Sequence, residues 1–269
     1  MRRARQTNAL GATRQTEFRI HTRVLGPNPP VVLTGPFRGM RYQTAALGSA
    51  YWPKVLGTYE CCLHPELEAL IVEAPSTLIN VGSGEGYYAV GFALRLPNAQ
   101  VIASDVDPRA RQLCRALSKA NHVNDRVRVT CELTATDLEH LVGPNSALLM
   151  DIEGAETRLL RPDLAPSLTQ TTILVELHDR KNSTPSAEII RRFANTHTAR
   201  LIQESEPDLH ELTNRLARLS PDDRRHVLCE YRPQRMQWAL LQPQRTALAR
   251  RQRDRRPAAG RARRRSGLE

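Results

Sequence analysis

A glycine-rich turn directly after an apolar segment constrains this chain most. Residues 78–86 read Leu-Ile-Asn-Val-Gly-Ser-Gly-Glu-Gly, and residues 87–96 continue with the apolar spacing of a helix. Gly82, Gly84 and Gly86 allow the backbone to turn sharply and to pass close to a ligand, where a Cβ atom would collide. The run therefore predicts the first strand–turn–helix unit of an open α/β sheet, with a ligand bound at the turn.

The spacing of these glycines indicates which ligand to expect. It is G-x-G-x-G, whereas the dinucleotide fingerprint places its third glycine one residue later, where this chain has Tyr87. The difference favours S-adenosylmethionine (SAM) over NAD, because the amino-acid end of SAM needs no pyrophosphate site. We expect the cofactor to contact Asn80, Gly82, Ser83, Gly84, Glu85 and Gly86.

A second acidic signal follows about 20 residues after the turn, as the fold predicts for a ribose-binding acid. Residues 99–105 read Ala-Gln-Val-Ile-Ala-Ser-Asp and are predicted to form the second strand. An acid at the carboxyl end of that strand can accept hydrogen bonds from ribose hydroxyls. Alternatively, Asp105 or Asp107 caps the helix that begins at Pro108. We assign the ribose to Asp105 and the cap to Asp107.

Strand and helix patterns alternate along the chain. This alternation predicts an α/β, Rossmann-like, mostly parallel sheet with right-handed crossovers and helices on both faces. Two further strands, near 199–204 and 235–241, flank a polar helical stretch over 207–228. The first five strands are expected near 77–82, 100–105, 126–131, 146–151 and 172–178, with helices near 86–95, 108–121, 135–141, 154–161 and 184–196.

The basic residues of the chain gather at its two ends. The formal net charge is +11, but residues 243–269 hold ten arginines and two acids, and residues 1–23 hold six arginines and one acid. The segment between is nearly neutral, so nucleic-acid contact is expected only through the ends. We expect a single domain: an irregular basic lead (1–30), an extension with a helix between Val55 and Glu73 (31–74), a SAM-binding domain (75–242) and a disordered Arg-rich tail (243–269).

Composition also bears on where the protein resides. No apolar run reaches membrane-spanning length, and the basic N-terminus lacks the hydrophobic stretch of a signal peptide. The five cysteines are scattered without metal-ligand spacing, which indicates reduced thiols. We therefore expect a cytoplasmic protein without a membrane partner.

Ionisable residues cluster after the fourth and fifth predicted strands. The chain reads Asp151-Ile-Glu-Gly-Ala-Glu156 after the fourth and Glu176-Leu-His178-Asp179 after the fifth. With the turn over 80–87 and the acid ending the second strand, these segments resemble the class I SAM-dependent methyltransferases, and more narrowly the FkbM-type group. The resemblance covers residues 75–200. It implies a seven-stranded sheet with an antiparallel last strand, and methyl transfer to a hydroxyl of a sugar or a polyketide-like natural product.

Methyl transfer to an alcohol requires a group that takes the hydroxyl proton. Asp151, Glu153 and His178 are the catalytic candidates, and His178 is the best general base because an imidazole titrates near neutral pH. The alternative for His178 is a histidine hydrogen-bonded in a loop. Glu153 and Glu156 equally fit acids that favour the N-terminus of the next helix, and for Glu156 we prefer that interpretation.

Further alternatives concern Glu60, a metal and the acceptor. Glu60 is expected to reach the SAM ammonium or the acceptor, or to be an ordinary acid near a helix start. Magnesium on Asp151, His178 and Asp179 would be an incomplete ligand set, so we predict no metal. A methyltransferase acting on nucleic acid or protein through the basic ends, and a noncatalytic SAM-binding module, are the competing functions.

Overall fold

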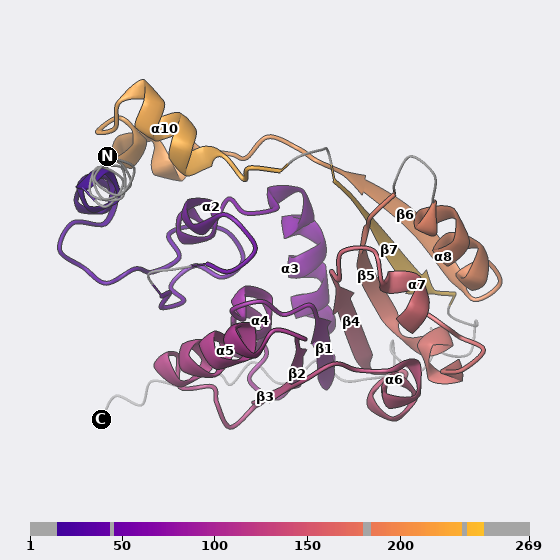
Figure 1. Cartoon of the computed structure of the whole chain (residues 1–269). Coiled ribbons are helices and arrows are strands. Elements are labelled where there is room, and N and C mark those ends of the chain that lie inside the picture. The colour runs from indigo at the N-terminus through magenta and orange to yellow at the C-terminus, as the bar shows by residue number, and fades with distance from the viewer. Residues whose placement is uncertain (1–14, 44–45, 180–183, 233–235, 245–269) are drawn as a thin grey trace, which may run out of the picture.

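A seven-stranded sheet forms the centre of the molecule. The computed structural model describes residues 15–43, 46–179, 184–232 and 236–244 (Figure 1). The strand order is β3-β2-β1-β4-β5-β7-β6. The first five strands pair in parallel, and β7 runs antiparallel to both β5 and β6, which confirms the expected fold. The strands are β1 (Thr77–Val81), β2 (Gln100–Ser104), β3 (Val127–Thr130), β4 (Ser146–Met150), β5 (Thr172–Leu177), β6 (His197–Gln203) and β7 (Gln237–Pro243).

Helices cover both faces of this sheet, as predicted. Successive strand residues point to opposite faces, so Leu78 packs in one apolar cluster and Ile79 in another. Figure 1 shows α4 and α5 on one side and α6, α7 and α8 on the other. The first cluster contains side chains of α3 (His64–Glu73), α4 (Tyr87–Arg95) and α5 (Pro108–Ala120). The second contains side chains of α6 (Ala135–Leu141), α7 (Glu156–Leu159), the 3₁₀ helix η2 (Pro166–Gln170) and α8 (Pro185–Phe193).

The segment before the sheet packs on the α3–α5 face together with the segment before β7. Residues 15–25 form a helix that lies beside α10 (Figure 1), and Arg19 donates to Asp223 of α10 over 2.8 Å. Ile20 and Val24 join the same apolar cluster as Val227. These elements are the helix over 15–25, α2 (Tyr51–Leu56), η1 (Cys61–Leu63), η3 (His210–Leu212), α9 (Thr213–Leu216) and α10 (Pro221–Leu228).

Three expectations about local structure are corrected. The prediction of an irregular lead is wrong for residues 15–25, which form a helix. Burial of apolar side chains on one side of this segment stabilises it. The helix expected between residues 55 and 73 is broken at Gly57, whose φ of +80° places it in the left-handed region. Pro65 does lie in the first turn of the second part, α3. The helix expected over 154–161 is a single turn, α7, because Glu153 and Gly154 both have positive φ.

Two expectations lie beyond these observations. The basic tail over 245–269 and the first 14 residues are outside the described residues. Among the described residues, no helix is both long and apolar enough to cross a membrane.

Candidate functional site

Four parallel strands bring the predicted site residues to one edge of the sheet. Val81 pairs with Ser104 of β2 on one side and with Met150 of β4 on the other. The residues that follow these strands are therefore neighbours: the glycine turn lies between Asp105 and Asp151. Met150 in turn pairs with Val175 of β5, which brings His178 to the same edge. This carboxyl edge is where open α/β sheets bind ligands.

The glycines of the turn have different structural roles. An added Cβ at Gly82 would lie 1.6 Å from the carbonyl oxygen of Asp151, so the turn and the β4 end fit together only without a side chain. At Gly86 the added atom would meet Cys114 Sγ at 2.7 Å. At Gly84 the nearest atom, the Leu47 carbonyl oxygen, would be 3.8 Å away. Gly84 thus leaves open space beside the backbone, which a ligand can approach.

Asp105 is fixed beside this turn. Its carboxylate accepts the backbone N–H of Gly84 and that of Asp107, each over 2.8 Å. Asp107 caps α5 by accepting the N–H of Arg109 over 2.7 Å, which confirms the cap assigned to this acid. Asp105 and Gly82 line a cavity of about 360 Å³. The carboxylate keeps lone pairs for further donors, so it fits the ribose hydroxyls expected there.

Asn80 and Ser83 also fit a polar ligand at the turn. Both are buried, yet Asn80 Nδ2 and Oδ1 and Ser83 Oγ make no hydrogen bond within the described part of the chain. Buried polar atoms of this kind ordinarily have a partner. The charged amino-acid end of SAM would supply donors and acceptors for them.

Glu85 is not in this cavity, contrary to our expectation. Its side chain is fully buried in an ion pair with Lys54 of α2, and it also accepts from Tyr42 Oη and from the N–H of Leu47. Burial alone would raise the Glu85 pKa, but the charge and hydrogen bond of Lys54, with that of Tyr42, hold it below its usual value. Glu85 therefore joins the segment before α2 to the glycine turn. We name this contact the Lys54–Glu85 pair.

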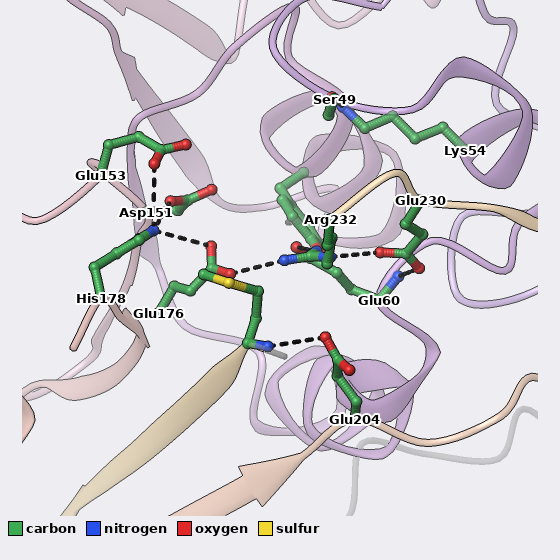
Figure 2. A network of polar contacts seen from close by, with 12 residues as sticks. Ser49, Lys54, Glu60, Asp151, Glu153, Glu176, His178, Glu204, Glu230 and Arg232 are labelled. Atoms are coloured by element: carbon green, nitrogen blue, oxygen red, sulfur yellow. Dashed lines mark hydrogen bonds and ion pairs between the residues drawn. The ribbon is translucent and has the colours of Figure 1, made fainter. Parts of the chain in front are cut away.

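His178 lies among carboxylates at the ends of β4 and β5 (Figure 2). Its Nδ1 is 2.8 Å from Glu156 Oε1, and its Nε2 is 3.6 Å from both Asp151 Oδ1 and Glu153 Oε2. Glu156 also accepts the N–H of Gly154 over 3.1 Å. The same carboxylate therefore has two roles: it binds the backbone at the start of α7, and it orients the imidazole. Sequence reasoning favoured only the first role. The expected Asp151, Glu153 and His178 are brought together.

The carboxylates around His178 set its protonation. Burial disfavours the imidazolium, but the hydrogen bond and charge of Glu156, with the charges of Asp151 and Glu153, outweigh it and raise the His178 pKa. Burial and the neighbouring charge of Asp151 raise the pKa of Glu176 to about 10. This shift favours the neutral form of Glu176 next to Asp151.

The same three side chains have the geometry of a cation site. Ligand atoms of Asp151, Glu153 and His178 lie within 4.8 Å of one another. The distance of 3.6 Å from His178 Nε2 to each carboxylate oxygen is longer than a hydrogen bond, but two ligand atoms of one ion can lie this far apart. Asp179, the other metal ligand considered, instead accepts the N–H of Ser186 over 3.0 Å. These side chains could hold a divalent cation next to an acceptor hydroxyl.

Arg232, which precedes β7, is the main residue that sequence reasoning missed. It contacts three glutamates in one network: Glu60, Glu176 over 2.8 Å and Glu230 over 2.8 Å (Figure 2). Glu60 also accepts from Tyr88 Oη, and burial raises its pKa. Its carboxylate is thus bound within the protein. Glu176, Arg232 and His178 line a second cavity of about 210 Å³, which shares Asp151 and Glu153 with the first cavity.

The curated relatives of this chain are methyltransferases. It is 30% identical over 112 residues to the release factor glutamine methyltransferase of Chlorobaculum tepidum, covering 42% of this chain and 30% of that protein. It is 33% identical over 113 residues to the ribosomal protein L11 methyltransferase of Pelobacter propionicus, covering 42% of this chain and 35% of that protein. The chain therefore spans about a third of the length of these relatives.

Solved structures resemble it more loosely. An O-methyltransferase from Bacillus cereus, solved in complex with S-adenosylhomocysteine (SAH), is 14% identical with a TM-score of 0.43, over 65% of this chain and 78% of that one. No family model matches the chain. The strand order with an antiparallel β7 is that of the class I methyltransferase fold.

Proposed function

We propose that the chain is a SAM-dependent methyltransferase that methylates a hydroxyl oxygen of a small molecule or glycan, with His178 as the general base. The observation that carries this proposal is the geometry of His178. One ring nitrogen is held by Glu156, and the other faces Asp151 and Glu153, which line the second cavity together with His178. The narrower FkbM-type placement rests on the segments at 151–156 and 176–178 and belongs to the same proposal.

The residues of the turn hold and orient the cofactor. Asp105 would accept hydrogen bonds from the ribose hydroxyls, and Asn80, Ser83 and the backbone at Gly84 would hold the polar amino-acid end. When bound, SAM supplies an electrophilic methyl group on its sulfonium. Much of the rate then comes from alignment of the acceptor oxygen with that carbon.

His178 removes the proton that the acceptor hydroxyl loses as the oxygen–carbon bond forms. Nε2 accepts this proton, and Glu156 stabilises the resulting imidazolium through Nδ1. Only the neutral imidazole can act as base. Because the carboxylates raise the His178 pKa, activity is expected to rise with pH through that raised pKa. Asp151 and Glu153 face the same nitrogen and favour its protonated form after transfer.

The first test is calorimetric titration of the purified protein with SAH, with Asp105→Ala as its partner variant. Micromolar binding that the variant loses supports the cofactor and its site. Transfer of labelled methyl from SAM to a panel of hydroxylated compounds then tests the reaction, with His178→Gln expected to abolish it while SAH binding persists. A folded protein that binds no SAH would sink the proposal and favour a noncatalytic module.

A second candidate, methylation of a protein or nucleic acid, is favoured by two observations. The curated relatives are named for a release factor and a ribosomal protein, and residues 243–269 carry ten arginines. Basic tails bind nucleic acid and acidic surfaces without specificity. Removal of residues 245–269 separates the candidates: small-molecule methylation should persist, whereas methylation of ribosomal material should fall severalfold and lose its salt dependence.

A further inference from the structure

A cavity of about 900 Å³ lies next to the reaction centre. It is bounded by the helix over 15–25, by α2 and by the segment from α10 to residue 231. Its volume exceeds those of the two cavities at the carboxyl edge, about 360 and 210 Å³. A space of this size fits a small molecule of roughly drug size.

The walls of this cavity are mostly aromatic and apolar. Phe18, Tyr51, Trp52 and Tyr231 line it, and we name it the aromatic groove. Phe18 is 75% exposed and Tyr231 is 63% exposed, although both are large side chains that proteins ordinarily bury. A concave surface that carries several exposed apolar side chains is more often a binding site than an ordinary part of the protein surface.

Hydrogen bonds fix the walls in place. Glu17 accepts from Trp52 Nε1 over 2.8 Å and contacts His226 Nε2 over 2.8 Å, and His226 Nδ1 contacts Tyr231 Oη. This chain of four side chains connects the helix over 15–25, α2, α10 and the segment after α10. The groove is therefore preformed, with a few polar groups along one wall, which is how small-molecule sites are built.

The aromatic groove adjoins the reaction cavity. Ser49 and Tyr231 line both the groove and the cavity that contains Asp151 and His178. A molecule in the groove can therefore extend one end past these two residues to the general base. Among the described residues, the lining of the reaction cavity is mostly carboxylate, arginine and histidine.

We propose that the aromatic groove holds the body of the methyl acceptor, an elongated and mainly apolar molecule that carries its reactive hydroxyl at one end. This inference rests on the proposed function and narrows its substrate class. Hydrophobic burial in the groove binds the body, and the hydroxyl enters the reaction cavity at His178. A fully hydroxylated sugar would not gain from these walls.

A series of 4-alkylphenols tests the proposal. 4-Ethylphenol to 4-hexylphenol are titrated calorimetrically into the full chain saturated with SAH. Each buried methylene should tighten binding about fourfold, so 4-hexylphenol should bind at least about thirtyfold tighter than 4-ethylphenol even with partial burial. Phe18→Ser should weaken 4-hexylphenol about tenfold and leave SAH affinity unchanged. Val72→Ser is the matched control, because Val72 is also exposed, at 77%, but lies on α3 away from the groove.

The outcomes separate this proposal from the proposed function. If SAH binds but the affinity of the alkylphenols does not depend on alkyl length, the groove assignment is overturned and the cofactor assignment stays intact. If affinity depends on alkyl length but Phe18→Ser does not reduce that dependence, the alkyl chain binds elsewhere, and the groove assignment is overturned as well. Loss of SAH binding would instead refute the proposed function. Finally, removal of residues 1–14 that tightens 4-hexylphenol more than tenfold would show that the chain's own N-terminus fills the groove, against the proposal.

Discussion

Replacing Lys54 by methionine tests whether the Lys54–Glu85 pair fixes the glycine turn. The two side chains are 6% and 0% exposed, so neither charge is solvated by water. Methionine keeps the length and apolar stem of lysine but removes its charge and its hydrogen bonds to Glu85 and Ser49. The Glu85 carboxylate would keep only Tyr42 Oη and the Leu47 N–H. An unpaired buried carboxylate then avoids its charge by taking a proton.

The cost follows from that proton. The ordinary pKa of Glu85 is 4.5, so protonation at pH 7 costs about 3.4 kcal/mol, from about 1.4 kcal/mol for each pH unit. This agrees with the loss of about 3–5 kcal/mol that breaking a buried ion pair causes. At pH 5 the same step costs only about 0.7 kcal/mol. The destabilisation by Lys54→Met should therefore shrink as the pH falls.

The sign of this dependence can be checked in both proteins. In the unaltered chain the Glu85 pKa is lowered on folding, so its stabilising contribution is present above pH 4.5 and is lost as the pH falls through the folded value. In Lys54→Met the folded pKa is instead raised. The stability that this group contributes is then greatest below 4.5 and is lost as the pH rises. Urea unfolding followed by circular dichroism at pH 5, 6 and 7 measures both.

Two variants control the experiment. Lys54→Met combined with Glu85→Gln removes the buried charge and should regain about 3 kcal/mol of the loss at pH 7. Arg225→Met removes one partner of the exposed pair with Asp222, whose side chains are 76% and 92% exposed, and should cost less than about 0.5 kcal/mol. A cost of Lys54→Met below about 1 kcal/mol at pH 7, or one equal at pH 5 and pH 7, would refute the reasoning.

Four further predictions concern the site. His178→Gln should lower kcat at least about a hundredfold with SAH affinity unchanged. Glu156→Gln removes the strongest contribution that raises the His178 pKa, so it should move the rise of the pH–rate profile to lower pH. An unmoved profile would exclude His178 as the base. Asp105→Ala should weaken SAH binding in calorimetry about tenfold or more, and equal affinity would remove Asp105 from the site. Gly82→Ala should lower the free energy of unfolding by at least about 3 kcal/mol. The control is Gly143→Ala, where an added Cβ meets no atom within 4 Å, and it should change this free energy by about 0.5 kcal/mol or less. Similar values for the two variants would contradict the close packing of Gly82 against Asp151.

The parts of the fold with regular local patterns could be predicted from the sequence. The first five strands are short apolar runs between turns, and each was expected within two residues of its observed ends. The helix over 15–25 could not be predicted in the same way. Its sequence is polar and basic, and its apolar side chains Ile20 and Val24 are buried in a cluster that includes residues as distant as Val227. The break at Gly57 has a similar origin, because an added Cβ there would lie 2.0 Å from the Thr34 carbonyl oxygen.

The site divides along the same line. Gly82, Asp105, Asp151 and His178 follow strands whose order the fold fixes, so their meeting at one edge could be predicted. Glu85 was misplaced because a motif position does not reveal where a side chain points. Its direction depends on Lys54, which is 31 residues away in the sequence. Arg232 stands in a polar link without a motif, and no local pattern indicated its contacts with Glu60 and Glu176.

These long-range contacts matter to the chemistry because they control the charge that His178 experiences. Arg232 pairs with Glu60, Glu176 and Glu230, so the carboxylates that raise the His178 pKa are those of Asp151, Glu153 and Glu156. That negative charge raises the His178 pKa and makes the neutral imidazole a stronger base. Base strength at the β5 end thus depends on a residue before β7 that the motif does not contain. The ionisable residues at the sheet edge and the packing of the segments around them must therefore be considered as one site.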